Sequence, residues 1–296
     1  MVRSREVSSG VGIRFSAADA LIYGVLFVSA ALMIYPFLNV FAVSMSDHSV
    51  YLSDPLTIIP RKLTFSAYSF VVTHPLIRIS YRNTVIVAVG GTLFRLIITA
   101  LTAFPLSRRG LRGKAFFMTV LIITMMFNGG LIPNFYLIRK LGMYDTLLAL
   151  FVPGALSAYY VILMKNFFES IPESLIEAAK MDGASEPFIL ARIVFPVSTA
   201  IVATLSLFFA VGLWNSFFSA IVYIRRRELW TLQLVLREIV IENTTALIDE
   251  HTSAGMFHPQ NLRYAVIVAA VVPILCLYPF LQRYFVKGIM IGSVKE

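Results

Sequence analysis

Residues 170–196, which read SIPESLIEAAKMDGASEPFILARIVFP, form a polar stretch between two long apolar segments, and the rest of the chain is organised around it. We call this stretch the knuckle. Of the 296 residues, 58% are hydrophobic and only 14% are charged, far outside the range of soluble globular proteins. The composition therefore predicts an integral membrane protein whose knuckle stands outside the apolar spans.

Helix signals divide the knuckle into two short helices. Ser170 and Glu173 have the spacing of a capping box, which predicts a helix that starts at Ser170. Gly183 is expected to end that helix, because glycine is the usual residue just past a helix end. A second start signal at residues 185–187 (SEP) predicts another short helix from about Glu186 that leads into residues 195–196.

Charge and composition exclude several classes of function. The net charge is +9, but the basic residues are spread between apolar runs instead of forming a stripe, so nucleic acid is not the expected partner. The single cysteine, Cys276, excludes an internal disulfide. No metal site is expected, because the histidines lie in polar connections without a cysteine or carboxylate at ligand spacing; they are His48, His74, His251 and His258.

The apolar runs predict an all-α, polytopic membrane protein with six transmembrane helices in a single permease domain, residues 1–296. Each run is long enough to cross the hydrocarbon core of a bilayer, and the first is too long for the core of a signal peptide. Membrane lipid is therefore an expected partner of the chain. The expected spans are about 20–45, 81–106, 115–138, 146–168, 194–223 and 264–286.

Interruptions and connections refine this layout. Residues 128–133 (NGGLIP) should break or unwind the third span, and Pro36 is expected to kink the first. Residues 46–80 contain turn signals and are interpreted as a loop with short helical pieces. Residues 224–263 are interpreted as a long polar loop.

Residues 107–114 (SRRGLRGK) set the expected orientation. They carry four positive charges in eight residues between two spans, and such clusters are typical of cytoplasmic loops. With six spans, this places the knuckle and both termini in the cytoplasm.

The knuckle also carries a family pattern. Glu177, Ala178 and Ala179 are followed by Gly183 and by residues 193–196 (IVFP), which resembles the EAA loop of binding-protein-dependent ABC importer permeases. That pattern is EAA, three residues, Gly, nine residues and Ile-x-Leu-Pro, so the phenylalanine at position 195 is a conservative departure. Further runs resemble the carbohydrate branch, closest to permeases for complex oligosaccharides of the aldouronate or alginate type: residues 82–84, 105–108, 129–133, 214–216 and 232–237.

The resemblance implies that the knuckle is a cytoplasmic coupling loop of a bacterial inner-membrane importer. In such importers the loop docks into a cleft of an ATPase subunit. The implied partners are a second homologous permease, two ATPase subunits that bind ATP and Mg²⁺, and an extracytoplasmic solute-binding protein. The alternative is that the acidic residues form a solvated helix face. The residues implied in coupling are Glu177, Ala178, Ala179, Asp182, Gly183 and Pro196.

The chain itself is expected to be non-catalytic and to hold no cofactor. No Gly-x4-Gly-Lys-Ser/Thr motif occurs, and residues 109–115 have neither the spacing nor the hydroxyl residue of a phosphate loop. ATP hydrolysis must therefore belong to partner subunits.

Candidates for the substrate path lie in three spans. Aromatic faces can stack on sugars and amides can bind hydroxyl groups, although ordinary helix packing would explain the same residues. Arg95 lies near the middle of the second span, where a charge is costly and faces protein or water; it could meet an acidic, uronate-containing sugar or a neighbouring permease. The other candidates are Trp214, Asn215, Phe217, Asn128 and Tyr136.

Alternatives from other classes remain. An ABC permease for a different solute would share the same coupling loop. An ion-coupled secondary transporter would need carboxylates within spans, and the sequence offers only Asp19 at a membrane edge. A membrane-embedded enzyme would need a convergent set of acid, base or metal ligands, and none is visible. The 224–263 loop either reaches a sugar-binding protein, as in maltose-type relatives, or is a flexible external loop.

Overall fold

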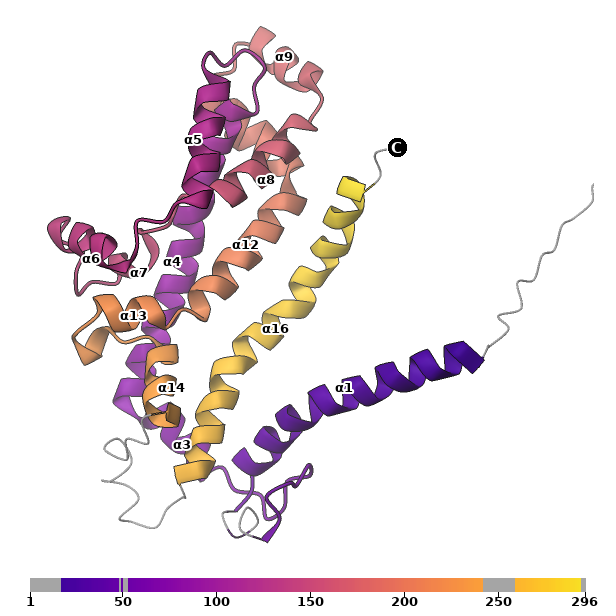
Figure 1. Cartoon of the computed structure of the whole chain (residues 1–296), viewed down its shortest axis with the longest axis vertical. Coiled ribbons are helices and arrows are strands. Elements are labelled where there is room, and N and C mark those ends of the chain that lie inside the picture. Colours follow the sequence, from indigo (N-terminus) through magenta and orange to yellow (C-terminus); the bar gives the residue numbers. More distant parts are fainter. Residues whose placement is uncertain (1–16, 48, 50–52, 242–258, 294–296) are drawn as a thin grey trace, which may run out of the picture. The chain divides into compact units, whose positions relative to one another are not determined.

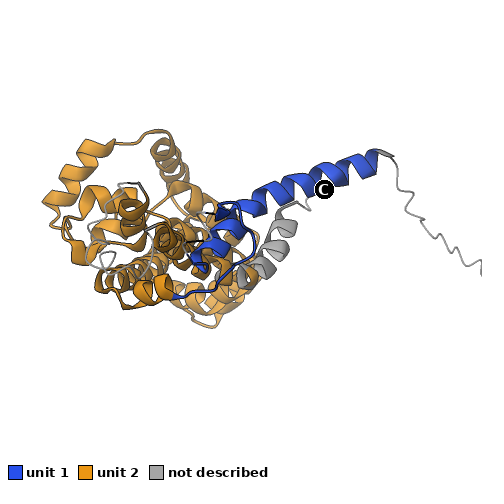
Figure 2. Cartoon of the chain, turned by 90° about the horizontal axis from the view of Figure 1, so that it is seen from below, with its two compact units in different colours: residues 1–65 blue, residues 66–296 orange. Residues whose placement is uncertain are grey.

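The structure is a computed structural model that describes residues 17–47, 49, 53–241 and 259–293. The regular elements in these ranges are helices, apart from one isolated β-bridge between Ser46 and Leu63, which confirms the predicted all-α class. The chain divides into two compact units, residues 1–65 and 66–296 (Figure 2).

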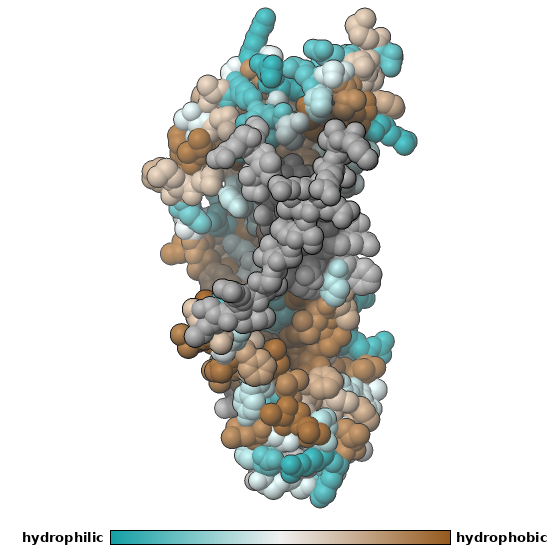
Figure 3. Space-filling model, turned by 90° about the vertical axis from the view of Figure 1, so that its right-hand side faces the viewer, coloured by the Kyte–Doolittle hydropathy of each residue, from teal (hydrophilic) through white to brown (hydrophobic). Residues whose placement is uncertain are grey.

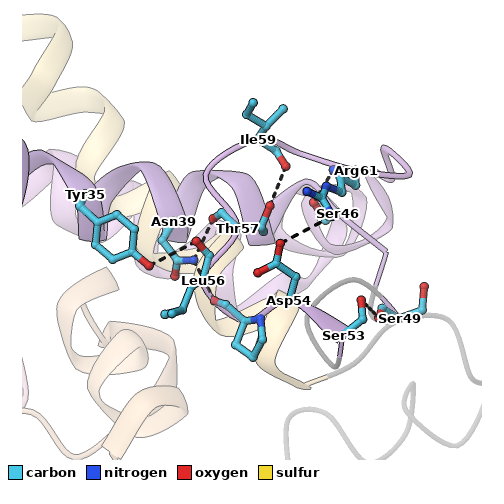
Figure 4. Close-up of polar contacts among 11 residues, drawn as sticks. Tyr35, Asn39, Ser46, Ser49, Ser53, Asp54, Leu56, Thr57, Ile59 and Arg61 are labelled. Carbon is cyan, nitrogen blue, oxygen red and sulfur yellow. Dashed lines mark hydrogen bonds and ion pairs between the residues drawn. The ribbon is translucent and has the colours of Figure 1, made fainter.

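The first unit is one long helix and the loop that follows it. Helix α1 (Ala17–Ser44) is apolar and contains Pro36. The loop is tied to the last turns of α1, because Asn39 Nδ2 donates to the carbonyls of Pro55 and Thr57, each at 2.9 Å (Figure 4). Tyr35 adds a hydrogen bond from its hydroxyl to the carbonyl of Leu56 at 3.2 Å (Figure 4). The expected first span is thus one helix, and the described part of the loop after it folds back onto the last turns of that helix.

The second unit is built on α4 (Pro75–Leu106), which follows the short helix α3 (Ser66–Thr73) (Figure 1). Pro75 occupies the first helical position, where a missing N–H costs little, so the helix begins before the expected residue 81. Helices α5 (Lys114–Met126) and α6 (Leu131–Lys140) follow, and they are bent by 115°. The predicted break at 128–133 is therefore present, and it turns the chain sharply.

Two expected spans are more broken than their sequence suggests. The range 146–168 holds α7 (Leu148–Phe151) and α8 (Ala158–Glu169), separated by a link in which Gly154 has φ +70°. The range 194–223 holds α12 (Thr199–Trp214) and α13 (Phe218–Tyr223). The last long helix is α16 (Pro259–Ser293). Length and composition give two helices able to cross a membrane in the described ranges, or up to four if each bent pair is one span.

The first half of the expected polar loop 224–263 is ordered helix. Here η2 (Arg227–Leu229) leads into α14 (Leu232–Ile241), whose residues Leu232, Val235 and Ile239 are fully buried against α3 and α16. The prediction of a polar loop is wrong for this part, because these apolar residues recur at helical spacing and form a face that packs on other helices. Residues 242–258 lie outside the described ranges.

The core of the second unit follows α4 along its length. The half of α4 that ends at Leu106 packs with α8, α12 and the knuckle. The half that begins at Pro75 packs with α3, α14 and α16. The tightest approach is at Gly91, where an added Cβ would lie 2.7 Å from Leu213 Cδ1 and 2.7 Å from Phe151 Cβ. Only a residue without a side chain lets α12 and α7 come this close to α4.

We expect Gly91→Ala to destabilise the protein while Gly90→Ala does not. The new methyl group at position 91 must displace Leu213 and Phe151, and overpacking of this kind costs about 1–3 kcal/mol. Position 90, one residue away in the same helix, has no atom within 4 Å of an added Cβ. Thermal unfolding of the purified protein in detergent measures the difference, and equal unfolding temperatures for the two variants would contradict this packing.

Candidate functional site

The first helix of the knuckle begins later than its sequence predicts. Helix α9 spans Glu173–Met181 and starts after Pro172, without a side-chain cap. Ser170 instead ends α8, where its hydroxyl donates to the carbonyl of Phe167 at 2.7 Å. The predicted capping box and the start at Ser170 are wrong, because α8 continues to Glu169 and uses the serine for its own end.

The predicted end of this helix is confirmed. Helix α9 stops at Met181, and Gly183 takes a left-handed conformation with φ +79°. The N–H of Ala184 reaches back to the carbonyl of Ala179 at 3.0 Å, as in a Schellman-type helix end. Glycine is favoured at position 183 because of this positive φ and not because of crowding, since an added Cβ there would meet no atom within 4 Å.

The second helix of the knuckle begins where predicted. Helix α10 (Glu186–Ile189) continues through a π-helical segment (Leu190–Val194) into α11 (Phe195–Val197). An ion pair of 2.7 Å between Lys180 and Glu186 joins α9 to α10. The chain then bends by 87° into α12, so the knuckle is continuous with α8 on one side and α12 on the other.

The knuckle has an inner and an outer face. Ile176 and Ala179 are 3% and 7% exposed and join the core beneath α9. The other residues implied in coupling are exposed, namely Glu177, Ala178, Asp182, Gly183 and Pro196. Polar side chains also gather at the knuckle end of the second unit (Figure 3). Ala179 is therefore a packing residue of this chain, and the surface open to a partner is formed by the exposed set, which we call the outer face.

A groove of about 720 Å³ is lined by residues of the knuckle, of the end of α4 and of the basic loop. Its apolar floor includes Leu101, Phe104, Ile176 and Leu190. Residues of the predicted basic loop form its charged rim: Arg109 lies 3.4 Å from Glu173, and the Arg108 guanidinium stacks over Phe104 at 4.3 Å from the ring centre.

The guanidinium group of Arg108 is partly buried and only partly hydrogen-bonded. Burial lowers the pKa of its guanidinium, while Glu186 and Glu173 oppose that shift. Its Nε and Nη2 atoms are buried without a hydrogen-bond partner among the described residues. The basic loop, which the sequence analysis used only to predict orientation, thus also contacts the knuckle directly.

Arg95 binds a backbone carbonyl group and not a carboxylate side chain. Its side chain is half-buried, and Nε donates to the carbonyl of Phe151 at 3.4 Å, at the end of α7. Within the described ranges it forms no ion pair. The arginine therefore supplies a donor where the break between α7 and α8 frees carbonyl groups.

Trp214 is held inside the second unit. It is 7% exposed, its Nε1 donates to the carbonyl of Ala270 at 3.1 Å, and Tyr81 meets its ring edge-on at 5.7 Å. It also borders an apolar pocket of about 430 Å³ formed by α4, α12 and Ile274. Its polar group is already used within the chain.

The remaining path candidates are more accessible. Asn215 is exposed at the end of α12, and Phe217 is 44% exposed. At the corner between α5 and α6, Asn128 accepts a hydrogen bond from the N–H of Gly130 at 2.9 Å, and Tyr136 is 59% exposed. No hydrogen bond or ring contact between described residues joins these two groups.

Sequence reasoning missed a clamp centred on Asp145. This residue has φ +58°, and its carboxylate accepts hydrogen bonds from the N–H groups of Arg225 and Arg226 and from Arg226 Nε, at 2.8–3.0 Å. Its own N–H donates to the carbonyl of Tyr223 at 2.9 Å. The clamp fastens the turn before α7 to the turn after α13; an aspartate in one turn and three consecutive arginines in another were the only sequence signal.

The clamp shifts the ionisation of Asp145. Burial alone would raise the pKa of this carboxyl, but the backbone N–H groups of Arg226 and Arg225 and the Arg226 guanidinium outweigh it and hold the pKa below its usual range.

Comparisons with known proteins agree with one another. The family model described as "Binding-protein-dependent transport system inner membrane component" matches residues 87–291. The polygalacturonan/rhamnogalacturonan transport system permease protein YtcP of Bacillus subtilis (strain 168) is 39% identical over 280 residues, covering 94% of this chain and 98% of that protein. The arabinooligosaccharides transport system permease protein AraQ of Halalkalibacterium halodurans is 25% identical over 275 residues, covering 90% of this chain and 92% of that protein.

A solved structure extends the similarity to the fold. It is a chain of a bacterial ABC transporter involved in the import of the acidic polysaccharide alginate. The TM-score is 0.85 and the sequence identity 32%, over 92% of this chain and 99% of that one.

The stabilising effect of Asp145 should depend on pH. Its pKa is lowered on folding, so its contribution is present above the unfolded pKa of about 3.9 and is lost as the pH falls through the folded value. We expect Asp145→Asn to lower the unfolding temperature at pH 7 and the difference from wild type to shrink below about pH 4. Asp182→Asn is the control, because that exposed carboxylate has no ion pair among the described residues. A difference that stays constant from pH 7 to pH 3 would contradict the clamp.

Proposed function

This chain belongs to the family of binding-protein-dependent transport system inner membrane components, and from that membership we propose that it forms part of the translocation path of an ATP-driven importer for oligosaccharides. The predicted family is confirmed. The chain is a multi-pass inner-membrane permease subunit of an ABC transporter; it is not an enzyme, and ATP is bound by the ATPase subunits of the system.

The outer face of the knuckle is the observation that carries the proposed mechanism. Glu177, Asp182 and Gly183 are exposed there, while the inner face packs on the end of α4. An ATPase subunit that binds the outer face therefore pushes on a body joined to α8, α12 and α4. Closure of two ATPases on ATP would move these helices together, which is the function of a coupling loop.

The topology follows from this assignment. We place the knuckle, the basic loop 107–114 and both termini in the cytoplasm. Six crossings result if α1, α4 and α16 each cross once and the broken segments α5–α6, α7–α8 and α12–α13 supply the other three. The turns at Asp145 and Arg226 then face the outside, together with α14, where the solute-binding protein would dock. A second, homologous permease completes the path.

The substrate class rests on the relatives and on accessible polar and aromatic residues. Polygalacturonan/rhamnogalacturonan, arabinooligosaccharides and alginate are named for similar proteins, and alginate is acidic. Asn215, Phe217, Asn128 and Tyr136 are exposed enough in this chain to meet sugars, whereas the indole N–H of Trp214 is occupied. Arg95 could serve an acidic sugar only by exchanging the carbonyl of Phe151 for a carboxylate. An acidic oligosaccharide is therefore our preferred substrate, and a different solute is the alternative.

Reconstitution tests the proposal as a whole. We expect the affinity-purified chain to bring down a second permease and an ATPase, and liposomes containing the complex to take up uronate oligosaccharides only with ATP and the solute-binding protein. Neutral oligosaccharides of equal length test the charge preference. Uptake that persists without ATP and follows a proton or sodium gradient would instead indicate an ion-coupled transporter.

We expect Gly183→Asp to leave membrane insertion intact and to uncouple ATP hydrolysis from uptake. The aspartate projects from the outer face and must hold a left-handed conformation that side chains disfavour. Gly142→Asp is a matched control, because Gly142 also has a positive φ, +70°, and no atom within 4 Å of an added Cβ, but lies in the turn after α6. Uptake per ATP hydrolysed is the measurement; normal uptake by Gly183→Asp, or equal loss in both variants, would remove the coupling assignment.

A further inference from the structure

Asn83 binds the backbone of a segment that is distant in sequence. It lies on α4 with no exposed surface, and its Nδ2 donates to the carbonyls of Glu228 at 2.8 Å and Trp230 at 3.0 Å. Its Oδ1 is buried without a hydrogen-bond partner among the described residues. Asn83 therefore ties the backbone of residues 228–230 to α4 by two hydrogen bonds.

Thr84, the next residue, supplies the cap of another helix. Its hydroxyl donates to the carbonyl of Ser80 at 2.8 Å and accepts the N–H of Leu232 at 2.8 Å. Leu232 is the first residue of α14, whose leading N–H groups have no acceptor within their own helix. Thr84 of α4 thus supplies the N-terminal cap of α14, in place of a residue at the start of α14 itself.

These hydrogen bonds attach a second helical segment, formed by η2 and α14, to α4. Residues 227–241, which we call the far segment, comprise η2 and α14. The far segment lies at the end of α4 opposite to the knuckle (Figure 1). Its buried side chains pack with α3 and α16, but Asn83 and Thr84 make the hydrogen bonds that fix its start to α4.

The other end of the same helix contacts the knuckle. Ala103, Phe104 and Leu106 of α4 share a core with Ile176 and with the second knuckle helix, and Arg109 pairs with Glu173 just beyond. The distance from Thr84 to Leu106 along the helix is about 33 Å at 1.5 Å per residue, roughly the thickness of a bilayer core.

Helix α4 is continuous over this distance, whereas the α5–α6 pair and the segment from α10 to α12 are not. The α5–α6 pair is bent by 115° and the segment from α10 to α12 by 87°. An unbroken helix transmits a displacement along its axis, whereas a bent pair can absorb it at the bend. Helix α4 contacts both the far segment and the knuckle without a break between the two contacts.

We propose that Asn83 and Thr84 are positioning residues that make the far segment move with α4, so that docking of the solute-binding protein on the far segment changes the position of the knuckle. The proposal rests on the proposed function, because it needs a partner at each end of α4. A partner that binds the far segment in one position more tightly than in another would thereby bias the knuckle.

The test uses the complete transporter, reconstituted in lipid with its second permease, ATPases and solute-binding protein. Thr84→Val removes the hydroxyl and keeps the shape. Thr99→Val is the matched control, because Thr99 is equally buried in α4 and its hydroxyl has no hydrogen-bond partner among the described residues. Thr84→Ser restores the hydroxyl. Amide hydrogen exchange of residues 228–235 reports anchoring, and the ratio of ATPase rates with and without loaded binding protein reports transmission.

We expect Thr84→Val to speed exchange in residues 228–235 at least tenfold and to lower the stimulation ratio at least threefold, with the basal ATPase rate within twofold of wild type. Thr84→Ser and Thr99→Val should behave as wild type in both measurements. Asn83→Leu, which removes two further bonds, should act in the same direction as Thr84→Val.

Three outcomes are decisive. Faster exchange in Thr84→Val with an unchanged stimulation ratio would overturn the transmission role. Unchanged exchange in both Thr84→Val and Asn83→Leu would overturn the anchoring. A wild-type complex that binds no ATPase or shows no stimulation at all would instead refute the proposed function, independently of these two residues.

Discussion

The close packing of α4 against α12 and α7 is the contact on which the second unit depends. At Gly91 the neighbouring side chains of Leu213 and Phe151 approach so closely that a methyl group would overlap both. From this crossing the core extends in two directions, to the knuckle at one end and to α3, α14 and α16 at the other. One helix therefore joins the two ends of the unit.

The membrane adds a second constraint, because backbone groups inside it need internal partners. The breaks that interrupt α7–α8 and α5–α6 are compatible with this rule only where side chains or protein surround them. Arg95 illustrates the principle, since its guanidinium serves the carbonyl at the end of α7 in place of a carboxylate. A charge in the middle of a long helix can thus be a structural donor.

Sequence patterns were most informative where a residue type has one dominant use. Gly183 ends α9 in a left-handed conformation as predicted, and the helix break predicted at residues 128–133 lies between α5 and α6. Sequence patterns gave a wrong prediction where a residue had two possible uses. Ser170 could cap the helix that follows or end the helix that precedes it, and only the length of α8 decides between the two. Likewise Ala179 belongs to the family pattern but faces its own core.

The sequence by itself determined the membrane class, the break at residues 128–133 and the family, because composition, glycine and proline positions and the spacing of residues 177–196 are local properties. Only the tertiary structure decided which face of the knuckle is open, how Asp145 meets Arg226, and why Asn83 and Thr84 stand together on α4. These features join residues that are 80 to 148 positions apart. No local pattern encodes such pairings; they arise when helices pack and buried donors and acceptors must find partners.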